Sequence, residues 1–264
     1  MHTVLFHDDN FTIYTYGIAY VFSIILTVFL SLRRAKFEGI PKERFLVAVF
    51  LAIVGIIVMG KTFHILVSWT WYMENPSRFF DFRIGHVFYG GYIGSITFPL
   101  IYLKWIKGPI LPSYDIPATY MPLGLAIHRA FACLNAGCCF GRPTDLPWGI
   151  IFPKGSLPYR AFGSVPLHPT QIYESFLALV IFVILLIWRK RGQKVPGELF
   201  ALQVALYSIG RFGIEFFRGD AIRGTWGPLS TSQWTSIAML GLAVSLAIHI
   251  VRKRRGTTVT GHEI

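Results

Sequence analysis

Four long apolar stretches constrain the fold of this chain more than any other feature of its 264 residues. A helix needs about 20 predominantly apolar residues to cross the hydrocarbon core of a bilayer, and these stretches have that length. Three further stretches are similar but are interrupted by glycine or polar residues. We therefore predict one all-α polytopic integral-membrane domain over residues 1–264, with seven transmembrane helices at residues 13–32, 45–68, 86–105, 116–136, 171–188, 198–217 and 234–251.

The composition agrees with a membrane location. Charged residues make up 14% of the chain and hydrophobic residues 53%, whereas soluble domains average about 25% charged residues. The net charge of +12 could suggest a nucleic-acid-binding protein, but such proteins cluster their basic residues on one face. Here the basic residues flank the apolar stretches, so we expect membrane lipids, and no nucleic acid, as partners.

The distribution of Lys and Arg among the connecting segments predicts the orientation. Residues 33–44, 104–115, 189–196 and 252–264 together contain 15 of them, and the connections on the opposite side contain 7. Because cytoplasmic loops carry the excess of positive charge, we expect the N-terminus outside and residues 252–264 as a basic cytoplasmic tail. The first ten residues lack the positive region of a signal peptide, which favours a permanent first transmembrane helix.

Three basic residues lie inside the predicted transmembrane helices: Lys61, Arg129 and Arg211. Each costs about 2.5–3.5 kcal/mol at the centre of a helix on insertion scales, so such residues are functional candidates by default. The Lys61 side chain could simply extend to the membrane surface. The two arginines have polar neighbours, which favours a binding or catalytic role.

Tyr207, Arg211, Glu215 and Arg218 form a polar stripe on the sixth predicted helix. Their spacings of four, four and three residues place them within about 80° of arc on one face. One interpretation is a buried ion pair that fixes the position of the helix. Two arginines for one glutamate leave a spare positive charge, however, and a guanidinium group binds phosphate in a bidentate way. We therefore interpret the stripe as a candidate site for a lipid phosphate.

Two further segments could contribute to such a site. The segment "PLHPTQIYESFL" places His168 and Glu174 where the fifth predicted helix begins; an ordinary helix cap with an interfacial anchor is the alternative. The segment "HVFYGG" places Gly90 and Gly91 at the start of the third. Glycine at these positions permits the close approach of either another helix or a ligand.

The segment "IHRAFACLNAGCCFG" leads out of the fourth predicted helix and contains Cys133, Cys138 and Cys139. A metal site formed by these cysteines with His128 is conceivable, but the spacing matches no familiar thiolate–imidazole pattern. We therefore expect neither a metal nor a cofactor. A Cys133–Cys138 disulfide is sterically possible, and the outer side of the membrane permits it. The cysteines could also simply pack in a tight turn, or one of them could be a catalytic thiol.

Several motifs together resemble one known family, the bacterial prolipoprotein diacylglyceryl transferases, of which this chain would be a diverged member or a paralogue. The resemblance covers most of the chain and depends on the segments "TYGIAY", "FGRPTDLPWGIIFP", "LHPTQIYE", "YSIGRFGIEFFRGD" and "LSTSQWTSIAM". It implies a seven-span transferase of the bacterial cytoplasmic (inner) membrane with a periplasmic N-terminus. It would transfer the diacylglyceryl group of phosphatidylglycerol to the lipobox cysteine thiol of a prolipoprotein, forming a thioether and releasing glycerol 1-phosphate.

The resemblance also implies roles for individual residues. Arg129 matches the arginine that holds the phospholipid headgroup, and Arg211 matches a second essential arginine, so both are candidate catalytic residues. The family's partners would be phosphatidylglycerol and the prolipoprotein signal peptide with its lipobox cysteine, and no cofactor. The candidate substrate-binding residues are Tyr16, Gly90, Gly91, Arg129, Asn135, Gly141, His168, Glu174, Tyr207, Glu215 and Arg218.

One departure from the family concerns the proton acceptor. The family has the motif Phe-His-Gly-Gly, and its histidine is commonly proposed as the base that takes the proton of the thiol. This chain has Tyr89 at the position of that histidine. By position we expect Tyr89 to take that role, with His128 as another candidate proton acceptor. Two other functions stay open: a paralogue that transfers a lipid group to a different acceptor, through Cys138 or Cys139, and a non-catalytic phospholipid-binding or transport protein.

Overall fold

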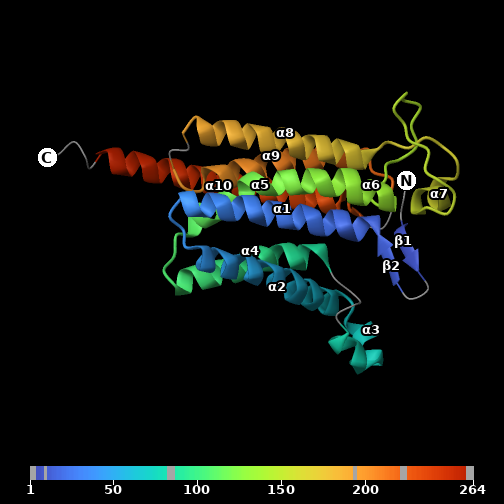
Figure 1. The fold of residues 1–264 in the computed structure, drawn as a ribbon, viewed down its shortest axis with the longest axis horizontal. Coiled ribbons are helices and arrows are strands. Elements are labelled where there is room, and N and C mark those ends of the chain that lie inside the picture. Colours follow the sequence, from blue (N-terminus) through green and yellow to red (C-terminus); the bar gives the residue numbers. More distant parts are fainter. Residues whose placement is uncertain (1–3, 9–10, 82–86, 193–194, 221–224, 260–264) are drawn as a thin grey trace. The chain divides into compact units, whose positions relative to one another are not determined.

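The computed structural model describes residues 4–8, 11–81, 87–192, 195–220 and 225–259. It is predominantly helical and divides into two compact units, one formed by Met1–Ser31 with Tyr114–Ile264 and the other by Leu32–Ser113. Figure 1 shows the helices and the hairpin of β1 and β2. We describe each unit by itself.

The larger unit contains most of the long helices. Its N-terminal hairpin pairs β1 with β2, and a second hairpin pairs β3 with β4. The helix α9 packs against both α8 and α10, and α8 also contacts the π-helix η2. The elements are β1 (Val4–Asp8), β2 (Phe11–Tyr14), α1 (Thr15–Phe37), α5 (Ile110–Ile127), η2 (His128–Cys133), α6 (Leu134–Ala136), α7 (Leu157–Phe162), α8 (Thr170–Lys190), α9 (Glu198–Glu215), β3 (Thr225–Trp226), β4 (Leu229–Ser230) and α10 (Thr231–Val259).

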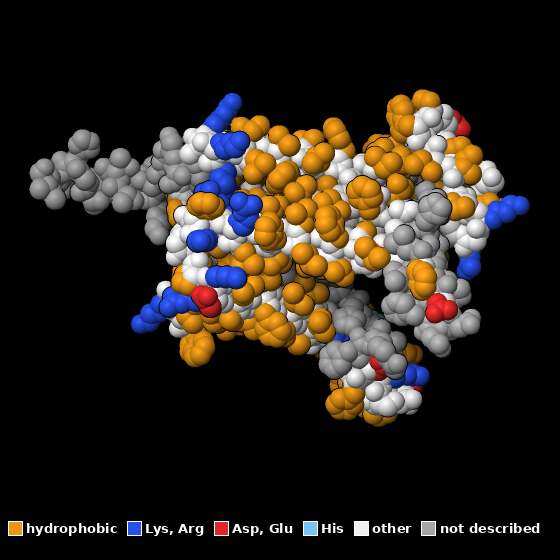
Figure 2. All heavy atoms as spheres, viewed as in Figure 1, with side chains coloured by type: hydrophobic (Ala, Val, Ile, Leu, Met, Phe, Trp, Pro, Cys, Tyr) orange, Lys and Arg blue, Asp and Glu red, His pale blue; other side chains and the backbone are white. Residues whose placement is uncertain are grey.

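Large apolar side chains on these helices are exposed rather than buried. Phe22 on α1, Phe176 on α8 and Leu242 on α10 are each at least half exposed, and Figure 2 shows hydrophobic side chains along the surface of α8. In water such a surface would be unfavourable, whereas acyl chains solvate it as well as a protein core does. The exposed faces are those expected of helices surrounded by lipid.

Each predicted transmembrane stretch coincides with a helix in the described residues. Four helices are long and apolar enough to cross a membrane: Thr15–Phe37, Lys42–Val67, Thr170–Lys190 and Thr231–Arg252. The number of crossings and the orientation of the termini stay predictions. The fourth stretch is the one whose form differs most, because α5 starts six residues before the predicted residue 116 and continues through a π-helix.

Asp115 lies in the part of α5 that precedes the predicted stretch. This carboxylate is buried and accepts hydrogen bonds from the backbone N–H groups of Gly197, at 2.6 Å, and Phe200, at 2.8 Å. These groups belong to the N-terminus of α9, whose first N–H groups have no partner within the helix. Asp115 therefore caps a helix 82 residues away in the sequence.

The smaller unit consists of α2 (Lys42–Val67), α3 (Trp69–Glu74), the 3₁₀ helix η1 (Pro76–Phe80) and α4 (Phe88–Trp105). Glycines hold α2 and α4 in backbone contact: a Cβ on Gly55 or Gly94 would collide with the other residue's carbonyl oxygen, and one on Gly90 would collide with the carbonyl of Met59. Gly91 faces Ile56 in the same contact. Close helix packing therefore accounts for Gly90 and Gly91.

Lys61 is buried, and its side chain reaches the segment that follows α2. Its ammonium group is buried and donates to the Tyr72 hydroxyl at 3.0 Å, the Arg78 carbonyl at 3.0 Å and the Asp81 carbonyl at 2.8 Å. Three oxygen acceptors match the three N–H donors of an ammonium group. Lys61 thus fastens the segment that follows α2 onto that helix.

Candidate active site

The described part of the larger unit contains a buried cluster of arginines around one carboxylate. Glu174 on α8 is fully buried, with 0% of its side chain exposed, and three arginines approach it. Its oxygens lie 2.7 Å from Nε of Arg129, 3.1 Å from Nε of Arg211 and 3.9 Å from Nη1 of Arg218. These arginines come from η2, from α9 and from the residues just after α9, so the carboxylate joins three segments.

Two more carboxylates complete the cluster. Arg211 pairs with Glu215 one turn further along α9, at 2.5 Å, and Arg218 makes two hydrogen bonds to Asp220, at 2.8 and 2.7 Å. Three arginines therefore meet three carboxylates. The spare positive charge inferred from the α9 stripe alone is wrong, because Glu174 and Asp220 offset it. Such pairing is what permits these charges to be buried, since desolvation of an unpaired charge costs several kcal/mol.

Although the charges of the cluster balance, some of its N–H donors make no hydrogen bond in the described structure. Among the described residues, Nη1 of Arg211 and Nη1 of Arg218 are buried and have no hydrogen-bond partner. An unsatisfied buried donor costs about 1–3 kcal/mol. Both atoms belong to guanidinium groups that their other nitrogens already hold in place. They are donors suited to the oxygens of a phosphate group.

The segment at the start of α8 holds a neighbouring loop in position. The Thr170 hydroxyl donates to the carbonyl of Cys139 at 2.6 Å, and the Gln171 amide donates to the carbonyl of Cys138 at 2.7 Å. Both side chains are fully buried. Neither acts as a helix cap: Pro169 occupies the N-cap position and no described side chain bonds to it there. The interpretation of this motif as an ordinary cap is therefore wrong.

His168 belongs to an aromatic group at the same end of α8. Its Nδ1 lies 3.1 Å from the Tyr173 hydroxyl, which also accepts a hydrogen bond from Nε1 of Trp148 at 2.7 Å. Burial and the positive charge of Arg142 lower the pKa of His168 below its ordinary value. The imidazole is therefore neutral at neutral pH, and its role in the described structure is to hold Tyr173.

Gly141 lies where three segments cross. Its N–H donates to the His168 carbonyl at 3.1 Å, and the N–H of Gly219 donates to the Phe140 carbonyl at 3.1 Å. A Cβ on Gly141 would collide with the carbonyl of His168, so only glycine fits. The crossing ties the loop after α6 to the segments before α8 and after α9.

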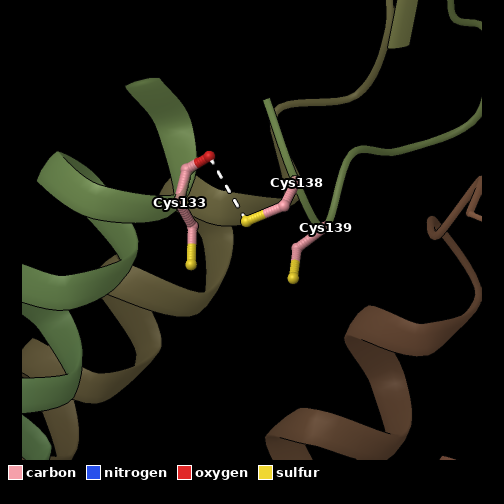
Figure 3. A group of neighbouring side chains, drawn as sticks. All are labelled: Cys133, Cys138 and Cys139. Atoms are coloured by element: carbon pink, nitrogen blue, oxygen red, sulfur yellow. Dashed lines mark hydrogen bonds between the residues drawn. The ribbon is translucent and has the colours of Figure 1, made fainter. Parts of the chain in front are cut away.

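The three cysteines lie together beside Arg129. No disulfide joins them, and their sulfur atoms all lie within 4.8 Å of one another. Figure 3 shows Cys138 and Cys139 on the loop next to Cys133 on the helix, with the Cys138 thiol directed at the Cys133 carbonyl. Nη1 of Arg129 lies 3.1 Å from the sulfur of Cys139 and 3.6 Å from that of Cys133. The sterically possible Cys133–Cys138 disulfide is therefore not formed in this structure.

The surroundings of Cys138 and Cys139 shift the pKa values of their thiols in opposite directions. Hydrogen bonds from the thiols of Cys133 and Cys138 lower the pKa of Cys139, and the charges of Arg129 and Arg218 add to that effect. Hydrogen bonds within the same group raise the pKa of Cys138, together with burial. Cys139 is therefore the loop cysteine that carries thiolate character.

Comparison with known proteins decides the family. The sequence model of the prolipoprotein diacylglyceryl transferase family, LGT, matches residues 3–249. The chain belongs to this family.

Curated relatives agree over the whole length. Phosphatidylglycerol–prolipoprotein diacylglyceryl transferase 2 of Clostridium perfringens (strain 13 / Type A) is 36% identical over 268 residues, which cover 100% of both chains. The enzyme of Clostridium tetani (strain Massachusetts / E88) is 35% identical over 90% of this chain and 93% of its own. That of Geobacter sulfurreducens (strain ATCC 51573 / DSM 12127 / PCA) is 34% identical over 91% of this chain and 92% of its own.

Membership and the four apolar helices together make this a membrane-embedded protein. Of the residues that the family resemblance singled out, the structure brings Arg129, Arg211, Arg218, Glu174 and Glu215 into one cluster. Tyr207 lies within electrostatic reach of the same cluster. Gly141 and His168 hold the adjoining loop.

The other candidate residues have different contacts in the described structure. The Asn135 amide donates to the Phe131 carbonyl on its own helical segment, at 2.8 Å. Tyr16 is 39% exposed, and its ring meets the ring of His128 edge-on at 5.5 Å between centroids. The Tyr89 backbone lies in the first turn of α4 in the smaller unit, but its side chain lies outside the described residues.

Sequence reasoning does not find several residues of the cluster. It places Thr170 and Gln171 at a helix start without a further role, and it gives Asp220 none. Ser230 donates to Glu215 at 2.9 Å, and Nη2 of Arg211 donates to the Ser232 hydroxyl at 3.3 Å. The signal that could have found these two serines is the segment "LSTSQWTSIAM", which resembles the family and contains both.

Proposed function

We infer that this chain is a phosphatidylglycerol–prolipoprotein diacylglyceryl transferase. Its family and the names of its curated relatives support this function. The observation that carries the inference is the buried arginine cluster, in which Glu174 holds three guanidinium groups and two of them have an Nη1 without a hydrogen bond among the described residues. A site with fixed donors and no reorganisation at the moment of reaction is suited to stabilise a developing anion.

In the proposed reaction, negative charge develops on the departing phosphate group. The thiolate of the prolipoprotein cysteine attacks the sp³ glycerol carbon, a C–S bond forms, and the C–O bond to phosphate breaks. The electron pair leaves with the phosphate as glycerol 1-phosphate. Nη1 of Arg211 and Nη1 of Arg218 would donate to the departing phosphate oxygens, while Arg129 would add its positive charge from the same cluster.

An apolar groove of the larger unit would accept an acyl chain of the phospholipid. It has a volume of about 370 Å³ and lies between α1 and the α5–η2 helix. Apolar atoms line it, as an acyl chain requires. Two wall residues, Ile127 and Phe131, lie four positions apart and so share one face of the α5–η2 helix. The lining residues are Thr15, Ile18, Ala19, Phe22, Ile127 and Phe131.

The proposal includes a topology and an acceptor. Seven crossings of the bacterial inner membrane, with a periplasmic N-terminus, would put the loop after α6 and the arginine cluster near the outer leaflet, where the thiol of a translocated lipobox cysteine arrives. The charge distribution among the connecting segments supports this orientation. Labelling of single cysteines in a cysteine-free background would test it, and a cytoplasmic residue 142 would contradict it.

Tyr89 is the proposed proton acceptor for the incoming thiol, with His128 as the second candidate. The test is a pair of variants, Tyr89→Phe and His128→Ala, measured for transfer to a lipobox peptide. Loss of turnover in one of them identifies the acceptor. Full turnover in both would exclude both residues.

The deciding experiment uses purified protein in phosphatidylglycerol vesicles with a lipobox peptide. We expect the peptide to gain the mass of one diacylglyceryl unit and glycerol 1-phosphate to appear in equal amount. Vesicles of phosphatidylcholine alone are the control and should give neither product. Binding of phosphatidylglycerol without either product would instead identify a phospholipid-binding protein.

The alternative of a covalent intermediate on a loop cysteine has its own test. Replacement of both Cys138 and Cys139 by serine removes either nucleophile. A modified protein detected by mass spectrometry in the presence of phosphatidylglycerol alone would support the intermediate. An unmodified wild-type protein under the same conditions would exclude it.

A further inference from the structure

The thiols of Cys133, Cys138 and Cys139 form a cluster that the transfer reaction does not use. All three sulfur atoms lie within 4.8 Å of one another, and Nε2 of His128 lies 3.3 Å from the sulfur of Cys133. Three thiolates and one imidazole are a ligand set for a tetrahedral zinc site. With Zn–S bonds of about 2.3 Å, the sulfurs of such a site lie about 3.8 Å apart, so the three sulfurs need to approach by about 1 Å or less. His128 would join them as the fourth ligand through a change of its side-chain position beside Cys133.

The π-helix explains why sequence spacing did not indicate this ligand set. In an α-helix His128 and Cys133, five residues apart, would point about 140° apart. They occupy the two ends of η2, where hydrogen bonds run from residue i to residue i+5 and bring such residues onto one face. The 3.3 Å contact between Nε2 of His128 and the Cys133 sulfur follows from that geometry.

The loop that supplies the other two thiols is held in place by groups outside the cluster. Thr170 and Gln171 bind the backbone carbonyls of Cys139 and Cys138, so these bonds fix the loop without engaging either sulfur atom. Cys139 has a φ of 62°, a left-handed conformation that a residue with a Cβ adopts at a cost. The loop therefore presents its sulfurs before any ion binds.

The charges around the cluster suit a zinc–thiolate centre. Three thiolates and one divalent ion carry a net charge of −1, and Arg129 approaches two of the sulfurs, at 3.1 and 3.6 Å. A neutral thiol packing cluster would gain little from a buried guanidinium in this position. Nδ1 of His128 is buried and without a hydrogen-bond partner among the described residues, so no hydrogen bond at that atom holds the imidazole away from its ligating orientation.

We propose that His128, Cys133, Cys138 and Cys139 bind one zinc ion. Four protein ligands fill the tetrahedral shell and leave no open position, so the site is structural and not catalytic. The ion would fix the loop to η2 and so hold Arg129 in its position beside Glu174. The sequence alone led us to expect no metal, and the proposal departs from that expectation. It does not depend on the proposed transferase function, but it excludes His128 as the proton acceptor, because the ligating nitrogen of a zinc-bound imidazole cannot take a proton.

The test is direct metal binding by the full-length protein in detergent, reduced and freed of metal. Titration with Co²⁺ should give thiolate-to-cobalt charge-transfer bands and the visible bands of a tetrahedral centre, saturating at about one ion per chain. Added Zn²⁺ should remove these bands. Their absence, or saturation without thiolate bands, would overturn the proposal.

A second measurement uses the wild-type protein alone and so does not depend on the folding of a variant. Zn²⁺ should protect the three thiols from a maleimide reagent in folded protein, and a chelator should restore their reactivity. Equal labelling with and without Zn²⁺ would contradict the site. A disulfide among these cysteines in protein isolated without reductant would also contradict it, because the ligands would then be oxidised.

Variants assign the ligands. Cys138→Ser with Cys139→Ser should abolish the thiolate bands, and His128→Ala should weaken Co²⁺ binding at least about tenfold. His249→Ala, on the exposed face of α10, is the matched control and should bind as the wild type does. Far-ultraviolet circular dichroism of each variant verifies its helical content. Unchanged binding in the double cysteine variant would refute the assignment.

Discussion

Two buried basic residues, Lys61 in the smaller unit and Arg211 in the larger one, are compensated for their lost hydration in different ways. Lys61 donates to three neutral oxygens, all within one segment that begins just after its own helix. Arg211 pairs with Glu174 and Glu215, and it keeps a buried Nη1 donor without a partner in the described structure. A fully satisfied cation holds a fold together, whereas one with an unused donor is prepared for a ligand.

The largest effect should follow from Glu174→Gln, which removes the negative charge that the three arginines share. Three arginines would then lack their common partner, and the loss of one member of a buried charge network costs about 3–5 kcal/mol. We expect a lower unfolding temperature in detergent and no measurable transfer. Glu43→Gln, at an exposed position of α2, is the control. Wild-type stability in Glu174→Gln would show that the cluster does not support the fold.

Arg211→Lys tests whether the unused donor acts on the leaving phosphate. Lysine keeps the charge but lacks the planar pair of Nη groups, so we expect kcat/KM per folded molecule to fall by about 10² to 10³. The peptide mass assay measures it, and Arg160→Lys, at an exposed position of α7, is the control. Activity equal to that of Arg160→Lys would remove Arg211 from the reaction.

Lys61→Met tests whether the buried cation of the smaller unit contributes to stability alone. Methionine fills a similar volume but removes the shared donor of two backbone carbonyls and the Tyr72 hydroxyl, so the protein should lose about 1–3 kcal/mol of stability. Transfer per folded molecule should not change. Lys104→Met, at an exposed position in the same unit, should affect neither quantity. A selective loss of turnover in Lys61→Met would mean that the smaller unit's cation also serves the reaction.

The smallest effect concerns pH and His168. Because the pKa of His168 is lowered in the folded state, folding favours its neutral form. Its contribution to stability is therefore present above the unfolded-state pKa of about 6.5 and is lost as pH falls below that value toward the folded-state pKa. Thermal unfolding between about pH 7 and 5 should show a slope that is reduced in His168→Gln. Identical slopes would contradict this contribution.

The helices could be predicted from the sequence because their signal is local. Apolar length indicated the positions of the membrane-type helices, and the four-residue spacing put Arg211 and Glu215 on one face, where they pair at 2.5 Å. The sequence did not predict that Glu174 joins three arginines, because those partners lie 37 to 45 residues away along the chain. Nor did it reveal the acceptors of Lys61, two of which are backbone carbonyls that no residue type indicates.

By itself, then, the sequence determined the class of protein, its family and the identity of the cations that it buries, since each depends on residue types and local spacing. Only the tertiary structure decided how those cations are neutralised and which donors they keep. It also decided that His128 and Cys133 share one face, because η2 is a π-helix. The physical reason is that ion pairs and thiol contacts require atoms within a few ångströms, and the packing of α8, α9 and η2 brings them there.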